Sequence, residues 1–199
     1  MIDFNILIAL VSYYFVMYVT PGPNNAMVLA SGLKFGFNRT IPHISGITIG
    51  HVTQLILVCF GLGKIFQIFP NLQNILRVLC AIYLLYLGYK IIGSFSNIKE
   101  DESKPLKFYE AALFQFINPK AWVVALTAAT AFFPSEENFV VATLFVAGTA
   151  PFVCFPSICI WAIFGNSLRI FIKNTKAKKI TEYILAILLV LTALVVLLK

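Results

Sequence analysis

The chain has 199 residues, of which 60% are hydrophobic, and its mean hydropathy is +0.90. Soluble domains contain roughly 45–50% apolar residues, so this composition excludes an ordinary soluble protein and predicts an integral membrane protein in a lipid bilayer. The formal net charge of +7 does not indicate a nucleic-acid partner, because the basic residues lie in short segments between apolar runs, as in the loops of membrane proteins.

Six apolar stretches are long enough to cross a membrane, which requires roughly 20 residues. Residues 1–5 lack the basic region of a signal peptide and no Ala-x-Ala site follows, so the first stretch is expected to be retained. The sequence therefore predicts an all-α polytopic membrane protein with six transmembrane helices. These spans are predicted at residues 4–32, 41–63, 68–93, 108–133, 139–165 and 180–198.

The hexapeptide at residues 20–25, Thr-Pro-Gly-Pro-Asn-Asn, interrupts the first span. Pro21 and Pro23 have no amide proton and Gly22 is free to take positive φ, so a helix must stop here and restart near Pro23. Backbone groups left unpaired at membrane depth are tolerated only where protein or a water-filled cavity covers them. The break is therefore a candidate binding site.

The second span contains Gly46 and Gly50, whose spacing lets two helix backbones approach closely. Plain packing is the favoured explanation for these glycines, and a place along a transport path is the alternative. His51 follows near the centre of the span, where an ionisable group is a candidate for function and a neutral imidazole bonded to a carbonyl is the equal alternative. Gln54 lies on the same helix face and is its expected partner.

Tyr83 and Tyr86 are one helical turn apart in the third span, so both hydroxyls are expected to face one way. An interfacial aromatic belt explains them at least as well as contact with a substrate. The cysteines form no CxxC pair and are interpreted as small apolar core residues, so neither a metal site nor a cofactor is predicted. They are Cys59, Cys80, Cys154 and Cys159.

Charge is divided unequally between the predicted loops. One set of loops carries Lys34, Arg39, Lys90, Lys99, Lys104, Lys107, Arg169, Lys173, Lys176, Lys178 and Lys179. The opposite set carries Lys64, Arg77, Lys199, Glu136 and Glu137. Because cytoplasmic loops are enriched in Lys and Arg, both termini are predicted to lie outside the cytoplasm.

The longest linker, residues 94–107, divides the chain into residues 1–93 and 108–199. Three spans in each half give the halves opposite orientations, which is the arrangement of an inverted repeat. The second half is broken at the corresponding place, where Asn118 and Pro119 interrupt the run 108–133. We therefore expect two inverted three-helix repeats with broken first and fourth helices.

The restarting helices are expected to point unpaired amides into the gap, from Asn24, Asn25 and Ala26 at one break and from Lys120 and Ala121 at the other. Such helix N-termini favour an anion, and with the Lys120 ammonium they suit a small carboxylate.

Carbonyls around Val19, Thr20 and Ile117, at the ends of the preceding half-helices, suit an ammonium group or a cation. A site that can bind both a carboxylate and an ammonium group fits a zwitterion such as an amino acid. The alternative is that the two breaks only kink the helices for packing. The predicted substrate-binding residues are Pro21, Gly22, Pro23, Asn24, Asn25, Gln115, Asn118, Pro119 and Lys120.

No acidic residue lies deep in a predicted span, so an all-carboxylate proton relay is disfavoured and His51 or Glu110 would have to carry protons. The sequence contains no H-E-x-x-H, G-x-S-x-G or Walker A motif. We therefore predict neither an enzyme nor catalytic residues.

Four motifs, in their order and spacing, resemble the LysE/RhtB family of bacterial amino-acid exporters: residues 21–24, the glycines of the second span, residues 83–88 and residues 118–121. The similarity runs over essentially the whole chain and is greatest to the cysteine and O-acetylserine branch. The resemblance implies an inner-membrane secondary exporter driven by the proton motive force. It places the family's Pro-Gly-Pro element at Pro21, Gly22 and Pro23, and its Asn-Pro element at Asn118 and Pro119.

We therefore expect export of a small neutral or polar amino acid, such as cysteine, O-acetylserine, threonine or homoserine, by alternating access. Coupling to H+ is expected, and homo-oligomerisation is left open. An exporter of a divalent cation or another metabolite is one alternative. A membrane protein with no transport function is the other.

Overall fold

The computed structural model describes residues 3–92, 104–134, 137–171 and 175–198, and every secondary-structure element in these ranges is a helix. Four described helices are long and apolar enough to cross a membrane. They are α3 (Phe37–Cys59), α5 (Leu72–Ile91), α8 (Phe139–Phe171) and α9 (Thr175–Leu198). The all-α prediction is thus confirmed for the described residues, and the helices agree with a polytopic membrane protein.

The predicted break in the first span is present. Helix α1 (Phe4–Val19) ends where the proline amides are missing, and α2 (Pro23–Phe35) restarts with Pro23 at its first position. The two helices are bent by 57° and count as a fifth span if they cross together. Gly22, the residue before α2, has extended backbone with φ of −178°.

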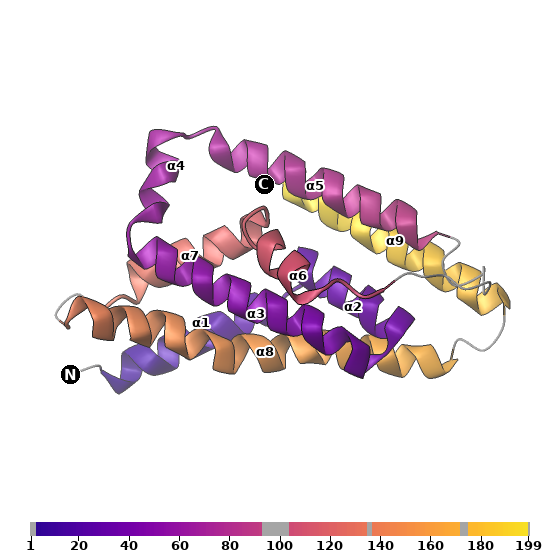
Figure 1. The fold of residues 1–199 in the computed structure, drawn as a ribbon, viewed down its shortest axis with the longest axis horizontal. Coiled ribbons are helices and arrows are strands. Elements are labelled where there is room, and N and C mark those ends of the chain that lie inside the picture. Colours follow the sequence, from indigo (N-terminus) through magenta and orange to yellow (C-terminus); the bar gives the residue numbers. More distant parts are fainter. Residues whose placement is uncertain (1–2, 93–103, 135–136, 172–174, 199) are drawn as a thin grey trace.

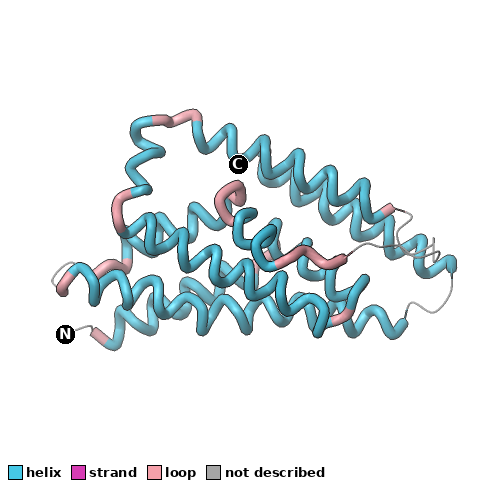
Figure 2. Tube along the Cα trace, viewed as in Figure 1, coloured by secondary structure: helices cyan, strands magenta, loops and turns pink. Residues whose placement is uncertain are grey.

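The predicted fourth span is also interrupted. Helix α6 (Phe108–Phe114) is followed by a turn, and α7 (Pro119–Ala131) restarts with Pro119 at its first position and Asn118 as its N-cap. Figure 2 shows both interruptions as loop segments near the middle of the molecule. Because α6 and α7 are short, the count of six spans and the inverted repeat stay predictions.

The helices form two groups, which are joined through α2 and α6. In Figure 1, α5 and α9 run side by side along one edge, while α8 lies at the opposite edge in contact with α1, α2 and α3. Helix α6 packs on α3 and α2 on α9, which joins the groups. One buried cluster joins α1, α3, α7 and α8, and a second joins α5 and α9 to α2 and α6.

The bounds of the predicted spans differ from the helix bounds by a few residues. Helix α3 begins at Phe37 and α9 at Thr175, before the predicted starts at 41 and 180. Between α3 and α5 the chain forms a short 3₁₀ helix, η1 (Leu62–Lys64), and α4 (Ile65–Ile68), at the border of two predicted spans. Hydropathy marks the part of a helix that is favourable in lipid. The helix can extend beyond that part, because its backbone groups form hydrogen bonds with each other.

Large apolar side chains cover the outside of the long helices. Phe152 on α8 is 82% exposed, and Ile82 on α5 and Ile187 on α9 are each more than half exposed. Such surface suits hydrocarbon rather than water, because a large exposed apolar area is unfavourable in water. This pattern supports the assignment of the chain to a membrane.

The helix ends next to the basic segments gather at one end of the molecule. Figure 1 shows the ends of α5 and α8 and the start of α9 at this end, and the N-terminus and the start of α8 at the other. This arrangement agrees with the predicted division of charge. The direction of the chain across a membrane stays a prediction.

Glycines permit the closest helix contacts. A Cβ atom at Gly46 would overlap the carbonyl oxygen of Phe108, and one at Gly50 would lie 2.6 Å from the Ala112 backbone. Both glycines therefore seat α3 against α6, as the packing explanation predicts. This contact holds the second break in its position beside α3.

Candidate functional site

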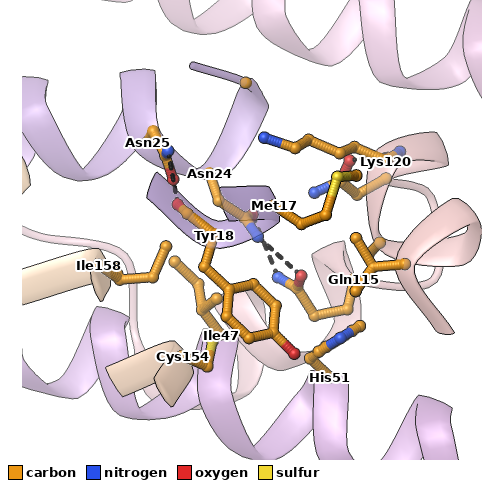
Figure 3. A pocket seen from close by; sticks show the side chains of 14 residues that line it. Met17, Tyr18, Asn24, Asn25, Ile47, His51, Gln115, Lys120, Cys154 and Ile158 are labelled. Carbon is orange, nitrogen blue, oxygen red and sulfur yellow. Dashed lines mark hydrogen bonds between the residues drawn. The ribbon is translucent and has the colours of Figure 1, made fainter. Parts of the chain in front are cut away.

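A small cavity lies where the two helix breaks face each other (Figure 3). Its volume is about 30 Å³, which is room for one or two water molecules. Side chains from α1, α2, α3, α7 and α8 and from the turn after α6 surround it. The lining residues are Met17, Tyr18, Gly22, Asn24, Asn25, Ile47, His51, Gln115, Asn118, Lys120, Ala121, Val124, Cys154 and Ile158.

Lys120 crosses from the second break to the first. Its Nζ donates hydrogen bonds to the Thr20 carbonyl at 2.6 Å and the Thr20 hydroxyl at 2.9 Å, and lies 3.4 Å from the Pro21 carbonyl. These carbonyls stand at the negative end of the α1 dipole, which favours a cation. Hydrogen bonds from a charged donor contribute about 1.5–3 kcal/mol each, so this contact is a strong link between the two breaks.

The carbonyls at the end of α1 also accept hydrogen bonds from the side chains of Asn25 and Trp161. The Asn25 amide donates to the carbonyls of Tyr18 at 2.9 Å and Thr20 at 2.7 Å. The Trp161 indole N–H donates to the Val19 carbonyl at 3.1 Å. The polar backbone exposed by the first break is thus covered by protein, as a membrane interior requires.

An amide pair also joins the two breaks. Asn24 Nδ2 donates to Gln115 Oε1 at 2.9 Å, and Gln115 Nε2 donates to Asn24 Oδ1 at 3.2 Å. The chain of hydrogen bonds continues from Gln54 Nε2 to the Gln115 carbonyl, and Gln54 Oε1 lies 3.2 Å from His51 Nδ1. The predicted partnership of His51 and Gln54 is therefore confirmed.

Two buried polar atoms at the cavity have no partner among the described residues. They are the Tyr18 hydroxyl and His51 Nε2. The two rings meet edge to face with centroids 5.5 Å apart, and Figure 3 shows the hydroxyl turned toward the imidazole. Buried polar groups nearly always have a partner, so a water molecule or a polar ligand is expected between these side chains.

The prediction of unpaired amides is wrong at three of five positions. The Ala26 amide donates to the Gly22 carbonyl, the Lys120 amide to Asn118 Oδ1 and the Ala121 amide to the Asn118 carbonyl. The reason is local: Ala26 already lies in the first full helical turn, and Asn118 is an effective N-cap.

The start of α2 is different, because Gly22 gives no side-chain cap to the amides of Asn24 and Asn25. Any anion bound through backbone amides is therefore expected at α2 rather than at α7.

Four predicted lining residues lie away from the cavity. Gly46 and Gly50 pack against α6. Tyr83 packs on Phe114 with ring centroids 5.1 Å apart, and Tyr86 is 54% exposed. The two tyrosines do face the same way, with centroids 6.4 Å apart, but on the outside of the bundle. The belt explanation therefore fits them better than contact with a substrate.

A larger groove opens on the other side of Lys120. Its volume is about 610 Å³, and it runs between the first break, the start of α7 and the side chains of α9. Met17, Gly22 and Lys120 line both the groove and the small cavity. The Lys120 side chain thus forms part of the wall that divides them.

Sequence reasoning missed Tyr18, Trp161 and Cys154 at this site. Tyr18 follows Tyr14 by one helical turn and directly precedes the break, so the sequence itself places its side chain close to the site. Nothing in the sequence marks Trp161, because it reaches the break from α8 through tertiary packing. Among the described residues, no group of three His, Cys, Asp or Glu side chains is placed to hold a metal ion.

Breaking the amide pair is expected to impair any transport through this site. Asn24→Ala and Gln115→Ala should each lower the transport rate, and the double variant should lower it by less than the product of the two, because they share one interaction. The measurement is the rate of solute release from vesicles for all three variants and the wild type. Strictly multiplicative effects would show that the pair does not act as a unit.

The chain matches the family described as LysE type translocator over residues 15–199, which includes both breaks. Cysteine/O-acetylserine efflux proteins of Escherichia coli (strain K12), Salmonella typhi and Salmonella paratyphi A (strain ATCC 9150 / SARB42) are each 29% identical to it over 168 residues. The alignments cover 81% of this chain and 83% of the relatives. No solved structure matches the chain.

Proposed function

Because the chain belongs to the LysE type translocator family, we propose that it exports small amino acids across the inner membrane of a bacterial cell. The observation that carries this proposal is the meeting of two broken helices at a polar cavity, bridged by Lys120 and by the pair of Asn24 and Gln115. Broken helices facing each other are a recurring way to build a solute site in membrane transporters.

The proposed substrates are small neutral or polar amino acids, with cysteine and O-acetylserine first. The similar proteins from Escherichia and Salmonella are named for efflux of these two compounds. Both compounds are zwitterions with a short polar side chain. The site offers carbonyls at the end of α1 for an ammonium group and the Lys120 cation for a carboxylate, which supports this class.

In the proposed binding step, the substrate ammonium takes the place of Lys120 at the carbonyls of Thr20 and Pro21. The Lys120 ammonium then pairs with the substrate carboxylate, which also lies near the amides of Asn24 and Asn25. The cavity of about 30 Å³ is too small for an amino acid, so binding requires Lys120 to move toward the groove. The exchange keeps every charged group paired throughout.

Transport would follow by alternating access, with α1–α2 and α6–α7 moving as the broken helices of two inverted three-helix repeats. The proposed boundaries of the repeats are residues 1–93 and 108–199. H+ is proposed as the coupling ion, and His51 is the titratable imidazole beside the cavity. Its Nε2 has no partner among the described residues and is suited to exchange a proton with a bound water.

The test uses the purified full chain in liposomes loaded with labelled cysteine, O-acetylserine, threonine, glutamate or tryptophan under reducing conditions. The expected result is faster release of the small neutral amino acids than from protein-free liposomes, with little release of glutamate or tryptophan. An imposed pH difference should change the rate if H+ is coupled. Release of none of these amino acids by correctly inserted protein would contradict the proposal.

A further inference from the structure

A second cavity, separate from the helix breaks, has three lysines among its lining residues. Its volume is about 120 Å³, and it lies at the end of the molecule where α2 and α5 end and the segment before α6 begins. Lys34, Lys90 and Lys104 line it, each from a different one of these segments. The Lys34 ammonium also lies over the Phe35 ring and the Lys90 ammonium over the Tyr86 ring. Three basic side chains along one cavity wall attract an anion.

His43 supplies an independent indication of a ligand. This α3 side chain lines the same cavity and is only 1% exposed, yet neither ring nitrogen has a partner among the described residues. Nearby Ser31 shares a hydrogen bond of 2.9 Å with Thr40. A buried imidazole without partners usually has an additional polar group beside it, so a bound molecule is the expected partner.

The rest of the wall is apolar. Leu87 and Ile91 on α5, Leu106 before α6 and Leu189 on α9 complete it. The outer faces of α5 and α9 next to the cavity carry exposed apolar side chains. A ligand that combines an anionic head with hydrocarbon chains matches this combination of lysines and aliphatic walls better than a fully hydrated ion does.

We propose that this cavity binds the phosphate headgroup of an anionic phospholipid, with its acyl chains along α5 and α9. The three lysines meet the phosphate charge as flexible cationic donors, which is a common way for lysine to bind phosphate. The lipid would tie the hairpin of α5 and α9 to α2 and α3 at the basic end. The proposal stands apart from the export function, because it concerns neither Lys120 nor the cavity between the breaks.

The test measures lipid binding to the detergent-solubilised full chain by native mass spectrometry and by thermal unfolding. The probes are phosphatidylglycerol, phosphatidylcholine and inorganic phosphate. For the wild type, phosphatidylglycerol should bind at low stoichiometry and raise the unfolding temperature, and phosphatidylcholine should do neither. The variant Lys90→Ala/Lys104→Ala should bind phosphatidylglycerol about tenfold or more weakly, since each lysine near an anionic headgroup contributes to binding.

The matched control is Lys176→Ala/Lys179→Ala, which removes two charges at the same end from exposed positions that do not line the cavity. This control should keep phosphatidylglycerol binding within about twofold of the wild type. Equal losses in both double variants would overturn the proposal in favour of general attraction to a basic surface. A shift with inorganic phosphate as large as that with lipid would also overturn it, because the ligand would then be the free anion.

Discussion

The variant Lys120→Met is expected to export at least about tenfold more slowly, because it cannot pair with the substrate carboxylate in the proposed binding step. A hydrogen bond from a charged donor contributes about 1.5–3 kcal/mol, and roughly 1.4 kcal/mol corresponds to a factor of ten. Methionine keeps the length and the apolar stem of lysine but cannot donate to the Thr20 and Pro21 carbonyls. The measurement is release of labelled cysteine or O-acetylserine from proteoliposomes.

Two further variants separate the role of this ammonium from a general effect of charge. Lys120→Arg keeps a cation but presents a wider planar group, so it is expected to retain part of the activity. Lys64→Met removes a lysine from η1 that lines neither the small cavity nor the groove, and it should release substrate at the wild-type rate. Unfolding temperatures of all three variants show whether a loss of transport comes from a loss of folding.

A wild-type export rate for Lys120→Met would remove this residue from the binding step. The bridge from Lys120 to Thr20 would then be only a structural contact between the breaks. The proposed site would have to depend on Asn24, Asn25 and His51 instead.

The variant Gly50→Ala is expected to destabilise the protein by about 2 kcal/mol, because a methyl group at this position overlaps backbone atoms that have little room to move. The added Cβ would lie 2.6 Å from both the Cα and the carbonyl oxygen of Ala112 on α6. For a chain of this size, such a loss lowers the unfolding temperature by roughly 4–8 °C. Thermal unfolding of the purified protein measures it.

Gly148→Ala on α8 is the matched control, because a Cβ at Gly148 meets no atom within 4 Å. Alanine is also the better helix former by up to about 1 kcal/mol, so this variant should unfold at the same temperature or slightly higher. Equal unfolding temperatures for the two variants would show that α3 and α6 can separate without cost.

The same displacement is expected to reach the candidate site. Gln54 on α3 donates to the Gln115 carbonyl just beyond α6, and Gln115 in turn holds Asn24. Moving α6 outward lengthens this chain of hydrogen bonds. Gly50→Ala should therefore also lower the export rate at temperatures where the protein is still folded.

The positions of the two breaks were predictable from the sequence because their cause is local. Proline lacks the amide that a continuing helix needs, and Pro23 and Pro119 each begin a new helix. The resemblance to the LysE/RhtB exporters, which the family match confirms, rests on these two motifs together with the glycines of the second span and residues 83–88. The His51 and Gln54 pair was predictable because both residues share one face of one helix.

The errors also have local physical causes. The amides of Lys120 and Ala121 were predicted to be unpaired, but Asn118 satisfies both through its side chain and its carbonyl. For Gly46 and Gly50 the favoured explanation, close helix packing, is confirmed by their contact with α6. Hydropathy placed the starts of two predicted spans inside α3 and α9, since it describes the solvent of a helix rather than its hydrogen bonds.

The sequence by itself determined that this chain is a helical membrane protein with two proline-initiated half-helices, because composition and missing amide protons act locally. Only the tertiary structure decided which groups meet between them. Lys120 and Thr20 are 100 residues apart, and Asn24 and Gln115 are 91 apart. Such contacts depend on how α1, α2, α6 and α7 are rotated about their own axes, which is set by packing against α3 and α8.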